Sequence, residues 1–182
     1  MKHRVTFAAI VAVALVALAP STAMAAKVTK CVVSNVGTCV ISGDTATVHL
    51  EPQSFARATT GGKSYGGNLA SAVDFSFSFT GDIEPAVASP RLEIPFDSPS
   101  GGTAYAVLDA SGCGYSESAS VQRVSTTLAN CRVLFMGIAY VNWDAFTTAN
   151  PMLRVAQGPT AWATVQTGRL PFDVTLSALS FG

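Results

Sequence analysis

A serine between two glycines is the first feature of this chain that suggests chemistry. Residues 62–66 read Gly-Lys-Ser-Tyr-Gly, which matches the Gly-x-Ser-x-Gly pattern of a nucleophilic serine at a sharp strand-to-helix turn. That chemistry needs a helix after the serine and a histidine base. Ser64 instead lies in a glycine-rich stretch with no amphipathic helix after it, and the one histidine beyond residue 25, His49, precedes it. We interpret the match as a loop and keep a secreted hydrolase acting through Ser64 as an alternative.

Carboxylates are the second candidate for catalysis. His49 lies on the polar side of an alternating segment with Glu51 beside it, and such a pair serves acid–base chemistry or forms half of a metal site. Glycoside hydrolysis needs two carboxylates that converge across a cleft, so a hydrolase acting through carboxylates is a further alternative. The acidic segments 82–84 and 97–101 do not match a calcium-binding EF-hand loop, which favours turn capping. We predict no catalytic residue, no metal ligand and no cofactor.

Three aromatic residues are the candidate binding site. Tyr140, Trp143 and Phe146 fall close together where an apolar segment runs into a loop. Exposed aromatic rings offer large rigid faces to sugars or apolar partners, whereas buried rings would cap the end of the core. We predict an extracellular protein or a carbohydrate as the partner. Trp162, which lies in another predicted strand, is assigned to the core.

The four cysteines predict two disulfides. Cys31, Cys39, Cys113 and Cys131 make an even count in a chain with an export signal, and four cysteines allow three connectivities. We favour Cys31–Cys39 and Cys113–Cys131, because each of these pairs flanks a short turn-rich stretch. Neither pair has the Cys-x-x-Cys spacing of a redox or zinc motif.

Residues 1–25 have the pattern of a cleaved export signal. Lys2 and Arg4 precede an apolar run of about 13 residues, shorter than the roughly 20 needed to span a bilayer, and Ala23-Met24-Ala25 fits a signal peptidase site. We expect a secreted or periplasmic domain over 26–182. The C-terminus carries no apolar span, and no cysteine directly follows the cleavage point, so we predict no membrane anchor.

Charge argues against nucleic acid as a partner. The chain has 11 basic and 11 acidic residues, and removal of Lys2 and Arg4 leaves 9 basic residues against 11 acidic ones. Nucleic-acid binding relies on basic patches that neutralise phosphates, and no basic stripe is present here.

Alternation of apolar and polar residues dominates the remaining sequence. We predict a strand over 69–79, with Val73, Phe75, Phe77 and Phe79 on one face, and an edge strand over 91–96, because Pro90 and Pro95 lack the N–H that a sheet needs. Residues 131–141 are apolar on both faces and predict a central strand covered on both sides. Further strands are expected over 45–51, 103–109, 152–155, 161–165 and 170–179, with a loop over 58–68 and a helical turn over 143–148.

This pattern predicts an all-β, antiparallel β-sandwich of immunoglobulin-like architecture with two local disulfides. The expected function is a non-catalytic binding, adhesive or envelope-associated module. A small secreted inhibitor or toxin that presents residues 58–68 is a third alternative.

Overall fold

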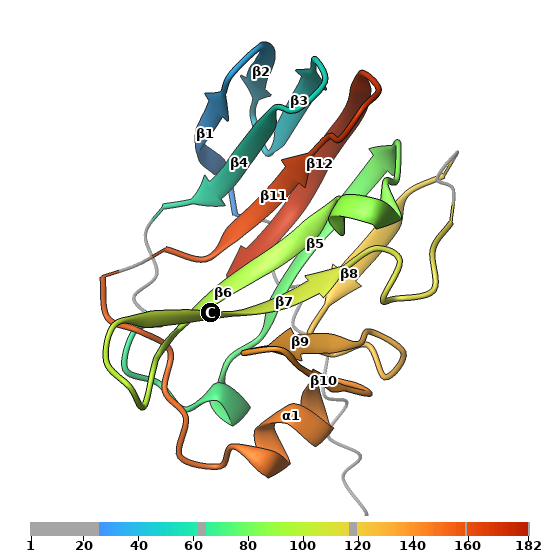
Figure 1. The fold of residues 1–182 in the computed structure, drawn as a ribbon. Helices are drawn as coiled ribbons and strands as arrows, with labels where there is room; N and C mark the ends of the chain where they lie inside the picture. The colour runs from blue at the N-terminus through green and yellow to red at the C-terminus, as the bar shows by residue number, and fades with distance from the viewer. Residues whose placement is uncertain (1–25, 62–64, 117–119, 159, 182) are drawn as a thin grey trace, which may run out of the picture.

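A computed structural model describes residues 26–61, 65–116, 120–158 and 160–181 (Figure 1). The predicted export segment 1–25 and Ser64 therefore lie outside the described residues. Within those ranges the chain forms twelve strands, one short α-helix and two 3₁₀ turns, η1 (Ala70–Ala72) and η2 (Pro85–Val87). All strand pairings between named strands are antiparallel.

The strands form two sheets, which we call the large sheet and the small sheet. The large sheet has the order β1 (Val28–Ser34), β4 (Phe55–Thr60), β11 (Trp162–Gln166), β6 (Arg91–Asp97), β7 (Thr103–Asp109), β9 (Val133–Phe135) and β10 (Ile138–Tyr140). The small sheet has the order β2 (Gly37–Ser42), β3 (Thr45–Leu50), β12 (Phe172–Phe181), β5 (Phe75–Gly81) and β8 (Gln122–Ser125).

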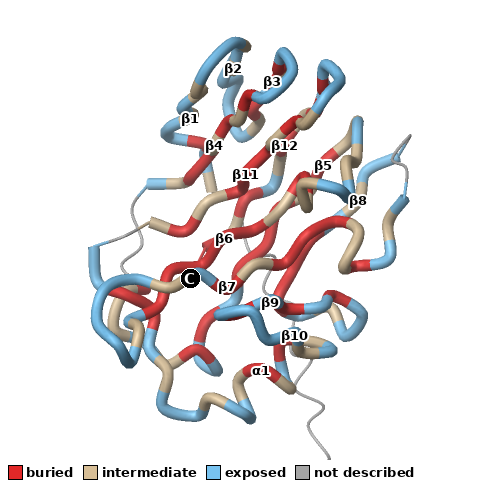
Figure 2. The backbone as a smooth tube through the Cα atoms, viewed as in Figure 1, coloured by how far each residue is buried: buried red, intermediate tan, exposed pale blue. Residues whose placement is uncertain are grey.

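One apolar core is shared by the two sheets, and Figure 2 shows buried residues along the central strands. The small sheet contributes Phe75, Phe77 and Phe79 from β5, and the large sheet contributes alternate residues of β6 such as Leu92 and Ile94. Successive side chains of a strand point to opposite faces, so period-two patterning buries one face of each sheet. Burying each such side chain stabilises the fold by about 1.5–3 kcal/mol. The prediction of a mostly β, antiparallel fold is confirmed.

Four of the predicted strands are confirmed within two residues. The segments expected over 45–51, 103–109, 161–165 and 170–179 correspond to β3, β7, β11 and β12. The strand expected over 69–79 begins only at Phe75, because residues 70–72 form η1. The loop expected over 58–68 is shorter than predicted, since β4 continues through Thr60.

Residues 91–96 form a strand as predicted, β6, but the prediction that this strand lies at an edge is wrong. β6 lies in the middle of the large sheet, between β11 and β7. Pro95 is tolerated there because β11 pairs with β6 only over Arg91–Glu93, and the chain around Val155 takes its place beyond that point. The N–H of Ala156 donates to the Pro95 carbonyl at 2.9 Å. The segment expected as a strand over 152–155 forms only isolated bridges.

The prediction of a central strand over 131–141 is also wrong. This segment folds into a hairpin, β9 and β10, at the edge of the large sheet. Met136 and Gly137 both have positive φ, at 50° and 81°, as two-residue hairpin turns require. Leu134, Met136 and Ile138 are exposed, so the run that is apolar on both faces is not covered on both.

The predicted disulfide pairing is confirmed. Cys31 and Cys39 are bonded, with Cα atoms 6.3 Å apart, and Cys113 is bonded to Cys131. The first bond is local in sequence but joins the two sheets, because β1 is an edge strand of the large sheet and β2 of the small sheet. The second closes the excursion by which the chain leaves β7, forms β8 in the small sheet and returns to β9. Two such bonds indicate an oxidising compartment.

The helical turn expected over 143–148 is confirmed as α1 (Trp143–Ala149). Asn142 caps it, since its side-chain oxygen accepts the N–H of Ala145 at 2.9 Å. Figure 1 shows α1 beside the β9–β10 hairpin, at the end of the molecule away from β2.

Candidate functional site

The predicted aromatic binding site belongs mainly to the core. Trp143 is 5% exposed and Phe146 is fully buried, so the expectation of an exposed platform is wrong for both rings. Phe146 packs against Phe96 and Phe135 with ring centroids 5.6 and 5.3 Å apart. Tyr140 remains partly exposed but contacts Phe146 edge-on at 5.4 Å. These rings close the end of the core beneath α1.

The residue after Ser64 has a structural role. Tyr65 is buried, its ring contacts Phe75 edge-on at 5.1 Å, and its hydroxyl oxygen accepts the N–H of Ala161 at 2.8 Å. Burial raises the pKa of Tyr65, and the hydrogen bond from Ala161 only partly opposes this effect. The segment that follows leads into η1 instead of an amphipathic helix.

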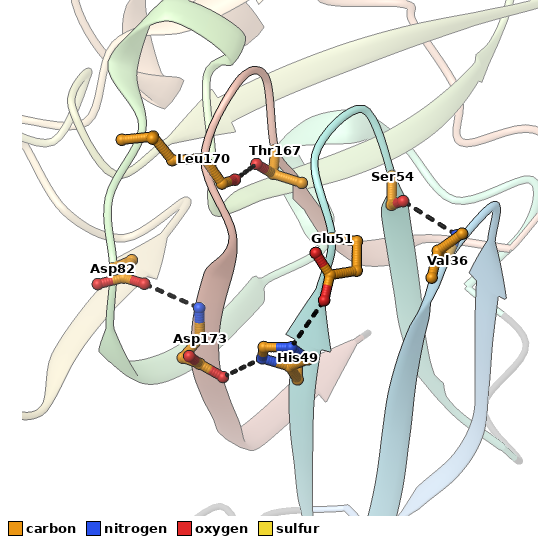
Figure 3. Close-up of polar contacts among 8 residues, drawn as sticks. All are labelled: Val36, His49, Glu51, Ser54, Asp82, Thr167, Leu170 and Asp173. Atoms are coloured by element: carbon orange, nitrogen blue, oxygen red, sulfur yellow. Dashed lines mark hydrogen bonds and ion pairs between the residues drawn. The ribbon is translucent and has the colours of Figure 1, made fainter.

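His49 lies between two carboxylates on the small sheet (Figure 3). Its Nδ1 is 2.8 Å from Asp173 Oδ1 on β12, and its Nε2 is 3.6 Å from Glu51 Oε1. Asp82 extends the cluster, because its carboxylate accepts the backbone N–H of Asp173 at 2.8 Å. The hydrogen bond and charge of Asp173 raise the pKa of His49, and Glu51 adds a smaller effect.

The chemistry of this cluster is that of a surface ion pair. Both ring nitrogens of His49 face carboxylate oxygens, so neither is directed at a hydroxyl that the ring would activate. Asp173 and Glu51 raise the pKa of His49, which stabilises the charged form relative to a free imidazole. No group of three or more His, Cys, Asp or Glu side chains able to hold a metal ion is found in the described parts of the chain.

Two of the grooves on the described part of the surface are shallow and open. One, of about 220 Å³, lies on the outer face of the small sheet, and its lining includes Asp173 and the threonines Thr47, Thr80 and Thr175. It includes Gly81, at φ 117°, where a Cβ would lie 2.3 Å from the Asp173 carbonyl oxygen. The other, of about 420 Å³, runs between residues 97–99 and 150–154. Neither groove brings two carboxylates together across it.

The outer face of the large sheet holds a more organised set of side chains. Arg57 of β4 and Arg91 of β6 both contact the carboxylate of Glu93, at 3.1 Å through Nη2 and at 2.7 Å through Nε. The Glu93 side chain is only 8% exposed, although it lies on the outer face. Arg91 also donates to the carbonyl of Val87 and to Gln166 Oε1. The network therefore holds Glu93 and Arg91 in fixed positions.

Paired residues continue this network into a row across the sheet, which we call the large-sheet row. Trp162 pairs with Glu93, which pairs with Val107, which in turn pairs with Leu134. Lys30 pairs with Thr59, and these two residues precede Trp162 in the register set by the Ala163–Ala58 pair. The row as a whole consists of Lys30, Thr59, Trp162, Glu93, Val107, Leu134 and Ala139. It has a cation at the β1 end and apolar side chains at the β10 end.

Trp162 is the residue of this face that sequence reasoning misassigned. It was expected in the core, but it is partly exposed, and the Lys30 ammonium lies 6.0 Å from its ring centroid. Tyr105, which pairs with Pro95 one step further along β6, is also exposed. The signal was present in the alternation of 161–165, because Ala161, Ala163 and Val165 take the inner face and leave Trp162 outside.

None of the described helices is long and apolar enough to cross a membrane. Comparison of the chain with protein-family models, with curated proteins and with solved structures finds no match.

Proposed function

We propose that this chain is a non-catalytic binding module that acts outside the cytoplasm, an immunoglobulin-like β-sandwich that presents a sheet face to its partner. The observation that carries the proposal is the large-sheet row, where Trp162 lies partly exposed beside the Arg57–Glu93–Arg91 network. Partly exposed aromatic rings on a rigid base are effective binding groups, since little conformational entropy is lost when they are covered.

The side chains and strands beneath the partly exposed Trp162 ring are held rigidly, which supports a binding function. Arg91 is held by three partners, Glu93, Val87 and Gln166, and β6 lies at the centre of the large sheet. A binding surface supported by fixed side chains needs little reorganisation when a ligand arrives.

Location outside the cytoplasm is supported by two features. The export pattern over 1–25 predicts cleavage before Ala26, and the two disulfides suit an oxidising compartment. The β1–β2 bond also ties the two sheets together where the chain begins its first strands.

The arrangement of the carboxylates supports binding more than hydrolysis. Glu93 contacts two guanidinium groups, Asp173 and Glu51 contact His49, and Asp109 accepts bonds from its own turn. Each of these carboxylates is occupied by a neighbouring cation or turn, whereas a glycosidase needs two carboxylates that face its substrate.

Retention on the surface of the cells that export the protein tests this function. We expect Trp162→Ala to lower retention of the disulfide-bonded protein about tenfold, as loss of a central aromatic contact does. Thr47→Ala, on the outer face of the small sheet, is the matched control and should retain full binding. Unchanged retention of the Trp162 variant, or release of reducing sugars or peptides from the surface by the wild type, would overturn the proposal.

A further inference from the structure

The exposed charge beside Trp162 is positive. Lys30 is exposed, and the Arg57 side chain is 41% exposed. The negative charge that contacts Arg57, on Glu93, is buried and is shared with Arg91. A ligand that approaches this part of the large sheet therefore meets cations, which favours an anionic partner.

A flat apolar ring lies within the same patch. The Lys30 ammonium lies over the Trp162 ring, 6.0 Å from its centroid, so a ligand unit that stacks on this ring also meets Lys30. The apolar face of a sugar ring stacks on an aromatic ring, and a carboxylate pairs with an ammonium or a guanidinium. A neutral sugar would leave the Lys30 ammonium without an anionic partner from the ligand, and a small inorganic anion would leave the Trp162 ring uncovered.

The geometry of the face suits an extended ligand. The large-sheet row crosses seven strands, and strands are spaced by about 4.8 Å, so the row is roughly 29 Å long. The two grooves described above lie elsewhere, one over the small sheet and one near the 150–154 segment. A linear polymer lying across the strands makes more use of such a surface than a compact molecule does.

A buried hydroxyl, that of Thr164, lies in the same part of the large sheet. Thr164 of β11 pairs with Arg57 on one side and with Arg91 on the other, and its Oγ1 is buried without a hydrogen-bond partner among the described residues. The Nε of Arg57 is likewise buried and unpartnered there. Unsatisfied buried polar groups cost stability, and both of these atoms lie beneath the patch, out of direct reach of a ligand on its surface.

On the basis of the proposed function, we propose that the large-sheet row binds an acidic polysaccharide whose sugar rings carry carboxylates. One sugar ring stacks on Trp162, and the adjacent carboxylates pair with Lys30 and Arg57. The apolar end of the row, at Val107 and Leu134, covers further ring faces along the polymer.

Three soluble polymers test this ligand class in affinity electrophoresis of the disulfide-bonded protein. Polygalacturonate combines sugar rings with carboxylates, dextran has rings alone, and poly-glutamate has carboxylates alone. We expect only polygalacturonate to retard the protein, with the apparent Kd rising about tenfold in Trp162→Ala and in Lys30→Ala. Raising the salt from 50 to 500 mM should weaken the same binding, because exposed charge pairs are screened. Arg169→Ala removes an exposed cation outside the row and is the matched control.

Each other outcome has a definite meaning. Equal retardation by dextran would overturn the charge argument, and equal retardation by poly-glutamate would overturn the ring-stacking argument in favour of an acidic protein surface. Absence of polygalacturonate binding overturns the ligand class; the proposed function then stands only if Trp162→Ala still lowers retention on the cell surface. If both measurements are unaffected, both proposals fail.

Discussion

Arg57 Nη2 lies 3.1 Å from Glu93 Oε2, although β11 separates the strands that carry these two residues. The side chain of Arg57 must cross a neighbouring strand, and Thr164 pairs with Arg57 at that crossing. The contact therefore links three strands of the large sheet at a point where Arg91 already neutralises Glu93 from its own strand. Two cations share one buried carboxylate, so the three residues should not contribute equally to stability.

Glu93→Ala should destabilise the protein more than Arg57→Ala. Loss of Glu93 removes the carboxylate that both guanidinium groups contact, although Arg91 keeps the Val87 carbonyl and Gln166 Oε1 as acceptors. Breaking a buried ion pair costs up to about 3–5 kcal/mol. Loss of Arg57 leaves Glu93 paired with Arg91, which limits the cost to about 1–3 kcal/mol. Free energies of unfolding from urea titrations compare the two. A larger effect of Arg57→Ala would show that Arg91 does not neutralise Glu93.

Trp143 should behave as a core residue instead of a binding residue. Trp143→Ala creates a cavity beside Phe146 and Phe96, with an expected loss of about 3–5 kcal/mol. Trp143→Phe should cost less than about 1.5 kcal/mol, because the buried Nε1 of Trp143 has no partner in the described structure and its loss removes a desolvated donor. Thermal or urea unfolding measures both, with exposed Val141→Ala as a control expected to change stability by less than about 0.5 kcal/mol.

The sequence predicts best those strands that bury only one of their two faces. Phe75, Phe77 and Phe79 alternate with polar residues, so the register of β5 with the core was readable from period two. The same reasoning does not work for residues 131–141. A run that is apolar on both faces predicts burial of both, but it does not indicate which side chains face the core. Gly137 was the missed signal, since a glycine within a strand pattern often marks a turn or bulge.

The edge position predicted from Pro95 and the core position predicted for Trp162 are wrong for a different reason. Both depend on pairing with strands that are distant in the sequence. A proline indicates an edge only if a strand would otherwise pair along its whole length, and β11 leaves β6 before Pro95. Trp162 was placed in the core because aromatic residues in strands usually are buried, but its position depends on which face of β11 the neighbouring alanines occupy. Neither the partner of a strand nor the Arg57–Glu93 contact across it is encoded locally.

Removing each disulfide should loosen a different edge of the molecule. Cys31→Ala with Cys39→Ala opens a link across 8 residues and should cost about 2.5 kcal/mol, and the Cys113 and Cys131 pair, across 18 residues, should cost about 3 kcal/mol. Amide hydrogen exchange should accelerate in β1 and β2 for the first variant and around β8 and β9 for the second. Exchange that accelerates equally over both edges would contradict this division.

The Tyr65 hydroxyl should stabilise the fold through one hydrogen bond, which it accepts from the backbone N–H of Ala161. Tyr65→Phe removes the acceptor of the buried Ala161 N–H and should cost about 1–3 kcal/mol, although the ring contact with Phe75 is kept. Tyr115→Phe is the matched control, because the Tyr115 hydroxyl donates to the Arg123 carbonyl near solvent, where water replaces the bond. Chemical denaturation measures both variants, and equal losses would show that the burial of the Ala161 N–H has no special cost.

His49 should give the protein a stability that is greatest in mild acid. Asp173 raises the pKa of His49 above its ordinary value of about 6.5, first through their hydrogen bond and then through its charge. A group with a raised folded-state pKa stabilises the fold fully below its unfolded pKa, and this contribution is lost as the pH rises through the folded-state value. The free energy of unfolding of the wild type should therefore fall, relative to His49→Gln, as the pH rises above about 6.5 through the raised folded-state pKa, by a small amount because the pair is exposed. NMR titration of the imidazole protons should show a larger fall in the pKa of His49 for Asp173→Asn than for Glu51→Gln, since Asp173 is 2.8 Å from the ring and Glu51 is 3.6 Å away. A His49 pKa at or below 6.5 in the wild type would mean that the ion pair does not persist in solution.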